Sequence, residues 1–460
     1  MNNFAPLKCI QSFRTITMDK SLTVERGLDL SIKGAAEWSS PTAVKPTVIA
    51  VIPDDFPGFL PKLEVKEGDK VEAGAPVMHD KNNEDVKLTS PVAGTVSAVI
   101  RGERRKIERV EITAAGNEEK HFNVGSTAES IIAALKDSGL WAEMRQRPYD
   151  IVPLTGISPR DIFVTAFDSS PLAPDINRII EDKQAQITAG IKALSSLTTG
   201  KVYICTKSDC SFEVPEEGEH YIVTGPHPSG NPGVQASLIS PINKGDTVWT
   251  LSILTVARIG ELCLTGKRDF STVVAVTGPE TVNPYYASTV QGASVKPLLD
   301  NHLPSDGKHL RIISGNILTG IKIDLNGFLR FPYTQLTVMA EGDDVDEFMG
   351  WASLSPSKMS VSRSFPFRFF KKKFSPDARI LGGHRAMIMS GIYDKVMPMD
   401  IMTEYLLKAI GARDIDMMEK LGIYEVAPED FALCEYVDPS KTEIQKAVRE
   451  GLEWLRKENE

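Results

Sequence analysis

Short alternating strands separated by turn residues constrain the fold of this chain more than any other feature. Within residues 63–78, Gly68 and Gly74 stand between short stretches in which apolar and polar residues alternate. Residues 87–112 repeat the pattern, with a proline and a glycine as punctuation and a charged turn before the last strand. Alternation with a period of two, interrupted by glycine and proline, is typical of short β-strands joined by turns. Residues 22–112 are therefore predicted to form a compact β module.

The order of these signals resembles the barrel-sandwich hybrid of biotinyl and lipoyl carrier domains. A carrier lysine must lie at the tip of a tight hairpin, and the nearest candidate is Lys81, ten positions before Pro91. That spacing is longer than in lipoyl domains, so a wide, acidic loop is expected. The Met-Lys-Met of biotin carriers is absent. We therefore expect Lys81 to be a solvated loop lysine, and a soluble biotin or lipoyl carrier is the alternative.

Residues 119–270 alternate between strand-like and helical patterns. Short apolar runs at 161–167, 201–205 and 220–224 fit buried strands. Apolar residues at i, i+4 and i+7 predict an amphipathic helix at 184–197. This alternation favours a parallel, Rossmann-like α/β layer. Further helical segments are expected at 127–135 and 140–145, and Asp175 is expected to cap a helix.

The rest of the chain is a smaller unit followed by a mixed C-terminal region. A strand is expected at 272–276, followed by several turn glycines. The last helix is marked by a single apolar stripe of Ile444, Val448, Leu452 and Leu455. At the other end, residues 1–17 lack periodicity and a second methionine stands at position 18, which favours an unstructured extension.

Composition excludes several classes of protein. The chain has 52 Lys+Arg and 61 Asp+Glu, a net charge of −9, which disfavours nucleic acid as a partner. Its most apolar stretch, 247–264, contains Arg258 and Glu261, so no transmembrane helix is expected. A secretory signal is not apparent. The 5 cysteines are odd in number and scattered without Cys-x-x-Cys, which suits a reducing compartment and disfavours iron–sulfur or zinc centres.

Familiar catalytic and nucleotide-binding motifs are missing. The sequence has no G-x-G-x-x-G, no G-x-S-x-G and no H-E-x-x-H, and its 7 histidines are dispersed. Residues 260–268 resemble a phosphate-binding loop only superficially. Five residues separate the two glycines instead of four, and Arg268 replaces the metal-binding Ser/Thr. No metal site and no self-contained catalytic centre are therefore predicted.

Two glycine-bearing turns carry candidate ligand-binding side chains. Residues 225–233 contain three prolines and three glycines after a predicted strand, and they include His227. Open α/β sheets bind ligands at this end of their strands, and a structural loop is the equally supported alternative. Gly382-Gly-His384-Arg385 places an imidazole beside a cation. It could hold an anionic or quinone-like carbonyl group, although a domain contact is the favoured interpretation.

A basic aromatic segment at 362–374 is the outstanding surface signal of an otherwise acidic chain. Basic side chains attract anionic headgroups and aromatic rings can enter the membrane interface, but the same composition could dock on a partner subunit. In the alternative, the phenylalanines fill a local core and the lysines are solvated. The candidate docking residues are Arg363, Phe365, Phe367, Arg368, Phe369, Phe370, Lys371, Lys372, Lys373 and Phe374.

Taken in order, the motifs of residues 19–457 resemble the A subunits of the bacterial Na⁺-translocating NADH:quinone oxidoreductases. The resemblance is carried by several short motifs whose joint order is specific. They are Arg26-Gly-Leu-Asp-Leu, Ser138-Gly-Leu-Trp, Arg147-Pro, Ile162-Phe-Val-Thr-Ala-Phe-Asp, Gly225-Pro-His-Pro, Arg311-Ile-Ile-Ser-Gly, Tyr393-Asp-Lys-Val-Met-Pro-Met-Asp and Leu433-Cys-Glu-Tyr-Val-Asp-Pro.

The resemblance implies a mixed α+β, multidomain fold. Its expected parts are a disordered extension (1–18), a barrel-sandwich hybrid domain (19–118), a Rossmann-like α/β domain (119–270), an SLBB or ubiquitin-like segment (271–330) and a C-terminal, partly helical domain (331–460).

The resemblance also implies a peripheral role on the cytoplasmic face of the bacterial inner membrane. The chain would be associated with quinone reduction coupled to Na⁺ export, with five other subunits as partners and only peripheral membrane contact. NADH, flavins and iron–sulfur centres would belong to other subunits, and no cofactor would be tightly bound here. His227, His384 and Arg385 are the candidate quinone-binding residues, chosen on their chemistry. The alternative is a structural adaptor that bridges subunits without binding a ligand.

Overall fold

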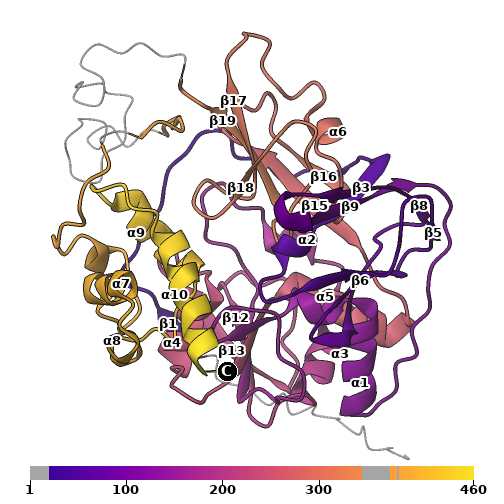
Figure 1. The fold of residues 1–460 in the computed structure, drawn as a ribbon, viewed down its shortest axis with the longest axis horizontal. Coiled ribbons are helices and arrows are strands. Elements are labelled where there is room, and N and C mark those ends of the chain that lie inside the picture. Colours follow the sequence, from indigo (N-terminus) through magenta and orange to yellow (C-terminus); the bar gives the residue numbers. More distant parts are fainter. Residues whose placement is uncertain (1–19, 344–372, 381–382, 460) are drawn as a thin grey trace, which may run out of the picture.

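The computed structural model describes residues 20–343, 373–380 and 383–459. The predicted extension at 1–18 lies outside these ranges. In the described part, the strands form four sheets, and helices surround them (Figure 1). The expected α+β architecture is confirmed. In Figure 1 the β module and the C-terminal helices lie on opposite sides, with the remaining two sheets between them.

The largest α/β layer is a sheet with the strand order β1-β13-β12-β11-β14-β10. All neighbouring strands are parallel except the edge pair of β10 and β14. Ile162, Phe163 and Val164 of β11 are completely buried, as expected for a strand covered on both faces. The predicted parallel layer is confirmed. The strands are β1 (Lys20–Thr23), β10 (Arg145–Arg147), β11 (Asp161–Thr165), β12 (Val202–Thr206), β13 (Gly218–Thr224) and β14 (Val248–Ser252).

Two helices of this layer, α3 (Gln184–Ser195) and α5 (Ile253–Thr265), pack tightly against each other. A Cβ atom at Gly260 would lie 1.7 Å from the backbone oxygen of Gln186, so only glycine permits this approach. Gly260 is therefore part of a helix contact and not of a phosphate-binding loop. The other helices of this region are α1 (Ala128–Ser138), α2 (Ile176–Ile179), capped by Asp175 as predicted, and α4 (Pro232–Ile239).

One local prediction in this layer is wrong. The sequence pattern predicts a helix over 140–145, but only Leu140–Glu143 forms a 3₁₀ turn (η3), and strand β10 follows at once. Pairing with β14 and a hydrogen bond from Leu154 N–H to the Gln146 side-chain oxygen (2.9 Å) hold this segment extended. Tertiary pairing has overridden the local pattern here.

The predicted β module consists of two small sheets with the orders β3-β9-β8-β5 and β4-β6-β7. Lys81 lies in the two-residue turn between β6 and β7, and it is exposed. The expected wide loop is therefore wrong, because a register shift within the hairpin absorbs the extra residues. The elements are β3 (Val48–Val51), η1 (Pro53–Asp55), β4 (Pro61–Leu63), β5 (Lys70–Val71), β6 (Pro76–Asp80), β7 (Asn83–Thr89), β8 (Gly94–Arg101), η2 (Glu103–Arg105) and β9 (Ile107–Ala114).

A further sheet has the order β18-β17-β19-β15-β16-β2. It joins a short N-terminal strand to the strands after residue 270, and its centre includes β19, which lies beyond residue 330. The elements are β2 (Thr42–Ala43), β15 (Ser271–Thr277), β16 (Tyr285–Val290), α6 (Lys296–Leu299), β17 (Leu310–Ser314), β18 (Ile321–Ile323) and β19 (Gln335–Ala340).

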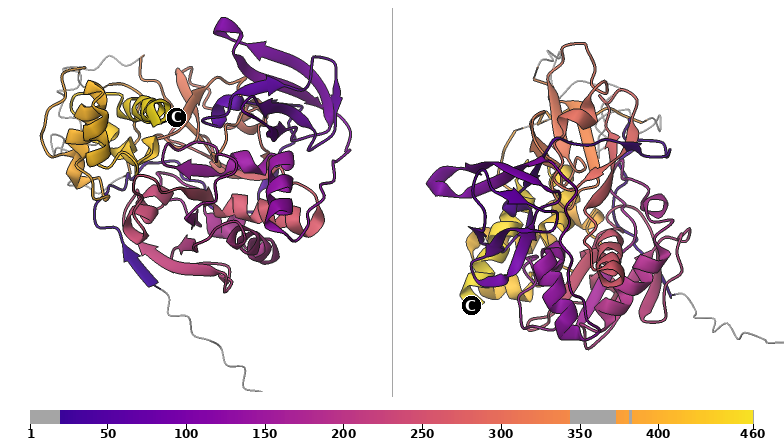
Figure 2. Two further views of the ribbon diagram at one scale, coloured as in Figure 1. Left: turned by 60° about the horizontal axis from the view of Figure 1, so that its bottom comes forward. Right: turned by 90° about the vertical axis from the view of Figure 1, so that its right-hand side faces the viewer.

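The C-terminal region is a cluster of helices at one side of the molecule (Figure 2). The apolar stripe predicted for the last helix is confirmed, because all four of its residues are completely buried. They pack in one core with Val24 and Val223 of the central layer. The elements are η6 (Tyr393–Lys395), α7 (Thr403–Ala412), α8 (Ile415–Lys420), η7 (Pro428–Phe431), α9 (Ala432–Val437) and α10 (Ile444–Asn459).

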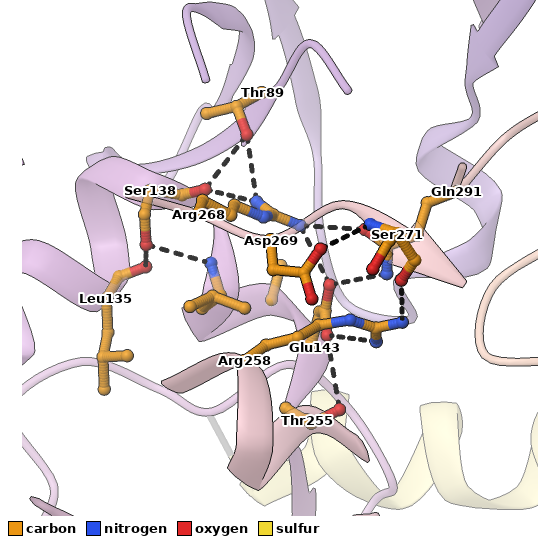
Figure 3. Close-up of polar contacts among 12 residues, drawn as sticks. Thr89, Leu135, Ser138, Glu143, Thr255, Arg258, Arg268, Asp269, Ser271 and Gln291 are labelled. Carbon is orange, nitrogen blue, oxygen red and sulfur yellow. Dashed lines mark hydrogen bonds and ion pairs between the residues drawn. The ribbon is translucent and has the colours of Figure 1, made fainter. Parts of the chain in front are cut away.

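A buried carboxylate joins three of these regions (Figure 3). The Glu143 side chain is only 1% exposed and accepts hydrogen bonds from Arg258 (3.2 Å), Arg268 (2.9 Å) and Gln291 (2.9 Å). Arg268 also donates to Thr89 Oγ1 of the β module (2.9 Å). The α/β layer, the β module and the sheet of β15–β19 thus meet at one charge cluster.

The charges of this cluster depend on one another. Burial by itself would raise the pKa of Glu143, but the attraction of Arg258 and Arg268 outweighs it and holds the pKa below its usual range. Burial lowers the pKa of Arg268 to about 10, and Glu143 opposes that shift. Removing the carboxylate would leave two buried guanidinium groups without compensation.

We expect Glu143→Gln to lower the free energy of unfolding by about 3 kcal/mol, because breaking one side of a buried ion pair strands the other charge. Urea denaturation at pH 7 measures this change. The contribution of an ionised Glu143 is present above the ordinary glutamate pKa of about 4.3 and is lost as pH falls through the lower folded value. The variant should therefore show a smaller acid-induced loss of stability than the wild type.

Glu119→Gln is the matched control, because Glu119 forms an exposed ion pair with Lys267 at 2.7 Å. Exposed pairs contribute about 0–1 kcal/mol, so this variant should stay close to the wild type. Equal destabilisation by the two substitutions would contradict the proposed role of Glu143.

Candidate functional site

A cavity of about 420 Å³ lies where two neighbouring parallel strands of the central sheet end. Its floor includes Thr165 at the end of β11 and Ser252 at the end of β14. The chain leaves β11 toward β12 on one side, whereas β14 lies on the other side. The cavity is therefore at the point where the strand order reverses, which is the usual ligand position in an open α/β sheet.

The remaining walls come from all the other parts of the fold. The β module supplies Asp55 and Pro57, and the C-terminal helices supply Gln445 and Arg449. The sheet of β15–β19 contributes the segments around its turns. The wall residues used below are Asp55, Phe167, Asp168, His227, Phe331, Tyr333, Gln335, Glu429 and Arg449.

His227 lies in the cavity wall, on the proline- and glycine-rich loop between β13 and α4. Two backbone contacts fix its position: its N–H donates to Asp29 Oδ1 (2.9 Å), and its carbonyl accepts from Leu28 N–H (2.8 Å). The ring is held by a hydrogen bond between Nδ1 and Ser169 Oγ (3.0 Å). The sequence prediction that this loop displays a histidine at the edge of the sheet is consistent with this geometry.

The second ring nitrogen of His227, Nε2, is buried and has no hydrogen-bond partner among the described residues. The residue as a whole is 3% exposed. Burial lowers the pKa of His227, against the attraction of Asp168 and Asp29, so the neutral imidazole is favoured. If Ser169 donates to Nδ1, the ring hydrogen resides on Nε2, which is then a free donor.

Gln335 adds a second polar atom without a partner. Its Nε2 donates to the carbonyl oxygen of Pro171 (3.1 Å) and to Thr337 Oγ1 (3.0 Å), which fixes the orientation of the amide. Pro171 offers only an acceptor there, so the amide nitrogen must face it. The other amide atom, Oε1, is buried and unpaired among the described residues. This residue offers an acceptor where His227 can offer a donor.

Aromatic side chains supply the apolar part of the wall. Phe331 stacks on Phe56 with ring centroids 5.3 Å apart, and Phe167 and Tyr333 also line the cavity. Asp55 accepts from the backbone N–H of Phe331 (3.0 Å) and from Arg330 Nε (2.6 Å). Burial raises the pKa of Asp55 to about 6, although Arg330 opposes that shift. The carboxylate thereby fixes the aromatic wall to the β module.

Arg147 attaches the C-terminal wall to the central sheet. Its guanidinium is 1% exposed and donates to Asp430 Oδ2 (2.7 Å) and to Glu429 Oε1 (2.9 Å). Arg449 of α10 forms an ion pair with Asp150. These contacts hold the last helices against the mouth of the cavity.

The other two candidate quinone-binding residues lie elsewhere. His384 and Arg385 are exposed, on a segment next to residues 440–441. His384 Nδ1 lies 2.9 Å from the carbonyl oxygen of Lys441, and Arg385 N–H donates to Ser440 O. Neither lines the cavity. The structure therefore does not bring His384 and Arg385 together with His227, and their position agrees with the contact interpretation of this turn.

Most of the predicted docking segment, 363–372, lies outside the described residues. Lys373 is exposed. Phe374, by contrast, is buried and forms a bridge with Ile32. Its ring packs in the core with the C-terminal helices. The Phe374 side chain is therefore not exposed for docking, contrary to the sequence prediction.

Several wall residues have no signal in the sequence. Gln335, Phe331 and Glu429 stand in no recognisable motif, and their partners are distant in the chain: Pro171 is 164 positions from Gln335, and Asp55 is 276 from Phe331. Arg147 belongs to a motif that carries the family resemblance, but its buried ion pairs could not be predicted from it.

The described residues contain neither a metal-binding cluster nor a helix that could span a membrane. No group of three or more His, Cys, Asp or Glu side chains there could hold a metal ion. The helices of that part are too short or too polar to cross a bilayer. No disulfide bond joins the described cysteines, Cys205, Cys210, Cys263 and Cys434.

Family models match three parts of the chain. Residues 22–115 match the NqrA N-terminal barrel-sandwich hybrid domain, residues 126–268 match the NqrA second alpha/beta domain, and residues 273–324 match the NQRA C-terminal domain. The sequence predictions of a barrel-sandwich hybrid, an α/β layer and an SLBB-type segment are thereby confirmed as parts of the fold.

Curated relatives match the chain along nearly its whole length. The A subunit of the Na(+)-translocating NADH-quinone reductase of Pasteurella multocida is 36% identical over 450 residues, which cover 95% of this chain and 100% of the relative. The proteins of the same name from Saccharophagus degradans and Vibrio atlanticus are 37% and 36% identical over 448 residues, with the same coverage. Among solved structures, an NAD⁺-reducing [NiFe]-hydrogenase chain matches with a TM-score of 0.32 and 11% identity over 47% of each chain, which is too distant to support an inference.

The lowered pKa of His227 predicts a measurable loss of stability in mild acid. As pH falls below about 6.5, the unfolded chain binds a proton at this residue while the folded chain resists it, so unfolding becomes more favourable. Urea denaturation measures the free energy of unfolding from about pH 7.5 to about pH 5.5, on either side of the ordinary histidine pKa. Over this range the free energy of unfolding should decline less for His227→Gln than for the wild type. His384→Gln, at an exposed position, should follow the wild type.

Proposed function

The chain belongs to the family of the A subunits of the Na⁺-translocating NADH-quinone reductases, and we propose that its cavity binds the head of the quinone. As a member of this family it is one subunit of an oxidoreductase complex, and it works with other subunits. The observation that carries the proposal is the buried, unpartnered Nε2 of His227 in the cavity wall.

The size and lining of the cavity support a small, flat, partly polar ligand. Small-molecule sites are typically about 300–1,000 Å³, mostly apolar, with a few polar atoms that fix orientation. Phe167, Phe331 and Tyr333 offer aromatic faces for a ring. Buried polar atoms are normally hydrogen-bonded, so the unpaired atoms of His227 and Gln335 would be satisfied by a ligand.

The unpaired atoms of His227 and Gln335 suit the two redox states of a quinone. A quinone carbonyl oxygen only accepts hydrogen bonds, and Nε2–H of His227 could donate one. A quinol hydroxyl group can also donate, and Oε1 of Gln335 can only accept. Formation of the quinol requires two electrons and two protons. In our proposal the electrons come from flavins or iron–sulfur centres in other subunits, which are themselves reduced by NADH, and the two protons come from water.

The structural adaptor is the alternative function, and the cavity disfavours it. An adaptor needs contacts between its parts, and the Glu143 cluster and the Arg147 ion pairs are such contacts. It does not need a cavity lined by unpaired polar atoms. The presence of such a cavity beside His227 therefore supports ligand binding.

The place of this chain in the cell is also part of the proposal. We place it at the cytoplasmic face of the inner membrane, in peripheral contact with the membrane-embedded subunits that export Na⁺. The basic aromatic stretch from Arg363 to Lys373 is our candidate for that contact on sequence grounds, because it combines positive charge with aromatic rings.

We expect His227→Leu to weaken quinone binding about tenfold, as appropriate for the loss of one buried hydrogen bond. Equilibrium binding of a short-chain quinone to the purified chain measures this. In the assembled complex, the KM for quinone should rise while NADH oxidation by an artificial acceptor stays unchanged.

Two further variants make the test specific. His384→Leu removes a histidine that does not line the cavity, so quinone binding should match the wild type. Ser169→Ala removes the partner of Nδ1 and should weaken quinone binding less than His227→Leu. The imidazole ring remains, but no hydrogen bond then determines which of its nitrogens carries the hydrogen. Unchanged binding in His227→Leu would refute the proposed site.

A further inference from the structure

The hairpin of β8 and β9 has a tight turn whose backbone conformation is unfavourable for the residues that form it. Lys106 N–H donates to the carbonyl oxygen of Glu103 (3.1 Å), which closes a four-residue turn. The two central residues, Arg104 and Arg105, have φ values of 51° and 61°. Two consecutive left-handed residues in a tight hairpin are characteristic of a type I′ turn.

Arginine is an unfavourable choice for such a turn. A left-handed conformation costs an L-residue with a side chain about 1–2 kcal/mol, and Asn-Gly is the preferred central pair. Here the sequence has two arginines instead. Strained backbone of this kind persists mainly where the side chains have a function.

The turn also concentrates exposed positive charge on an acidic chain. Arg101, Arg104 and Arg105 are exposed, and none of them has an ion-pair partner within the described residues. Arg101 Nη1 donates to the carbonyl oxygen of Arg105 (3.2 Å), which places the Arg101 guanidinium beside the turn that carries the other two arginines. Lys106 is paired with Asp54 at 2.7 Å.

The local acids do not neutralise this tip. Glu103 is part of the turn, and the Glu108 carboxylate lies against Gly102, but neither is ion-paired with the three arginines. The tip contributes no side chain to the buried cores, and β8 lies at the edge of the molecule (Figure 1). Its residues are therefore not explained by the fold or by the cavity.

We propose that the arginine turn, defined as Arg101, Arg104 and Arg105, is a docking surface for a carboxylate-rich face of another subunit of the complex. The proposal rests on the family assignment, which makes this chain part of a multi-subunit complex, but not on quinone binding in the cavity. Guanidinium groups carried on a hydrogen-bonded turn suit bidentate contacts with carboxylates better than lysines would.

A lipid surface fits the arginine turn less well. Each basic residue near an anionic membrane contributes about 1 kcal/mol, so three give weak attachment. The turn itself, 101–106, carries no aromatic or large apolar side chain that could enter the membrane interface. Acidic protein is therefore the favoured partner, and lipid is a distinguishable outcome of the test.

A photo-crosslinking residue at position 104 of the full-length chain, in the assembled complex, identifies the neighbour directly. We expect an adduct with another subunit, within a peptide that contains Asp or Glu. An adduct with lipid alone, or no adduct with another polypeptide, would overturn the proposal. Quinone need not be present, so failure here is distinguishable from failure of the cavity proposal.

Arg104→Asn combined with Arg105→Gly tests the charge without disturbing the fold, because Asn-Gly is the preferred pair in this turn. The melting temperature of the isolated chain should be unchanged or higher. Retention of the chain on complex purified through a tag on another subunit should fall several-fold after a high-salt wash. Lys66→Gln with Lys70→Gln removes the same charge near the opposite end of β8 and should retain wild-type binding. Equal retention of the two double variants would contradict the proposal.

Discussion

The ionised carboxylate of Glu143 is the interaction on which the arrangement of the domains depends. A buried charge is costly unless it is paired and hydrogen-bonded, and here the partners come from separate parts of the chain. Arg258 belongs to α5, Arg268 follows this helix and reaches the β module, and Gln291 directly follows strand β16. Each of these side chains would lack its buried hydrogen-bond partner if its region moved away from Glu143. The three regions therefore have their lowest free energy in the arrangement that brings these side chains together. The same arrangement sets the distances between the cavity walls, since Glu143 also borders the cavity.

Position in the sheet explains why the cavity exists at all. The strand that follows β11 in the chain, β12, lies on one side of it and β14 lies on the other, so the cavity lies at the point where the strand order reverses. The loop with His227 rises on one side of this space, and the β module with the turns of the neighbouring sheet closes the other. Some polar atoms of these loops, such as Nε2 of His227, have no hydrogen-bond partner among the described residues.

Local patterns in the sequence predict the elements that local forces determine. The stripe of Ile444 and Leu455 identifies α10, and the turn-rich loop after a strand identifies His227 as a candidate site residue. Errors arise where distant pairing decides. Residues 145–147 form an edge strand because they pair with β14, and Lys81 lies in a tight turn because a register shift in the hairpin absorbs the extra residues. Gln335 escapes prediction because its role follows from Pro171, which is 164 positions away. The motif order identifies the family, but it carries no information on these contacts.

The wall of the cavity is drawn from almost the entire length of the chain, from Asp55 to Arg449. A polypeptide emerging from the ribosome would complete its β module and its central sheet while the last wall residues are still unsynthesised. Under our proposal, a quinone head would meet a complete wall only after translation has passed Arg449. A product that stops before Gln445 would lack part of the wall, even with a complete β module and central sheet.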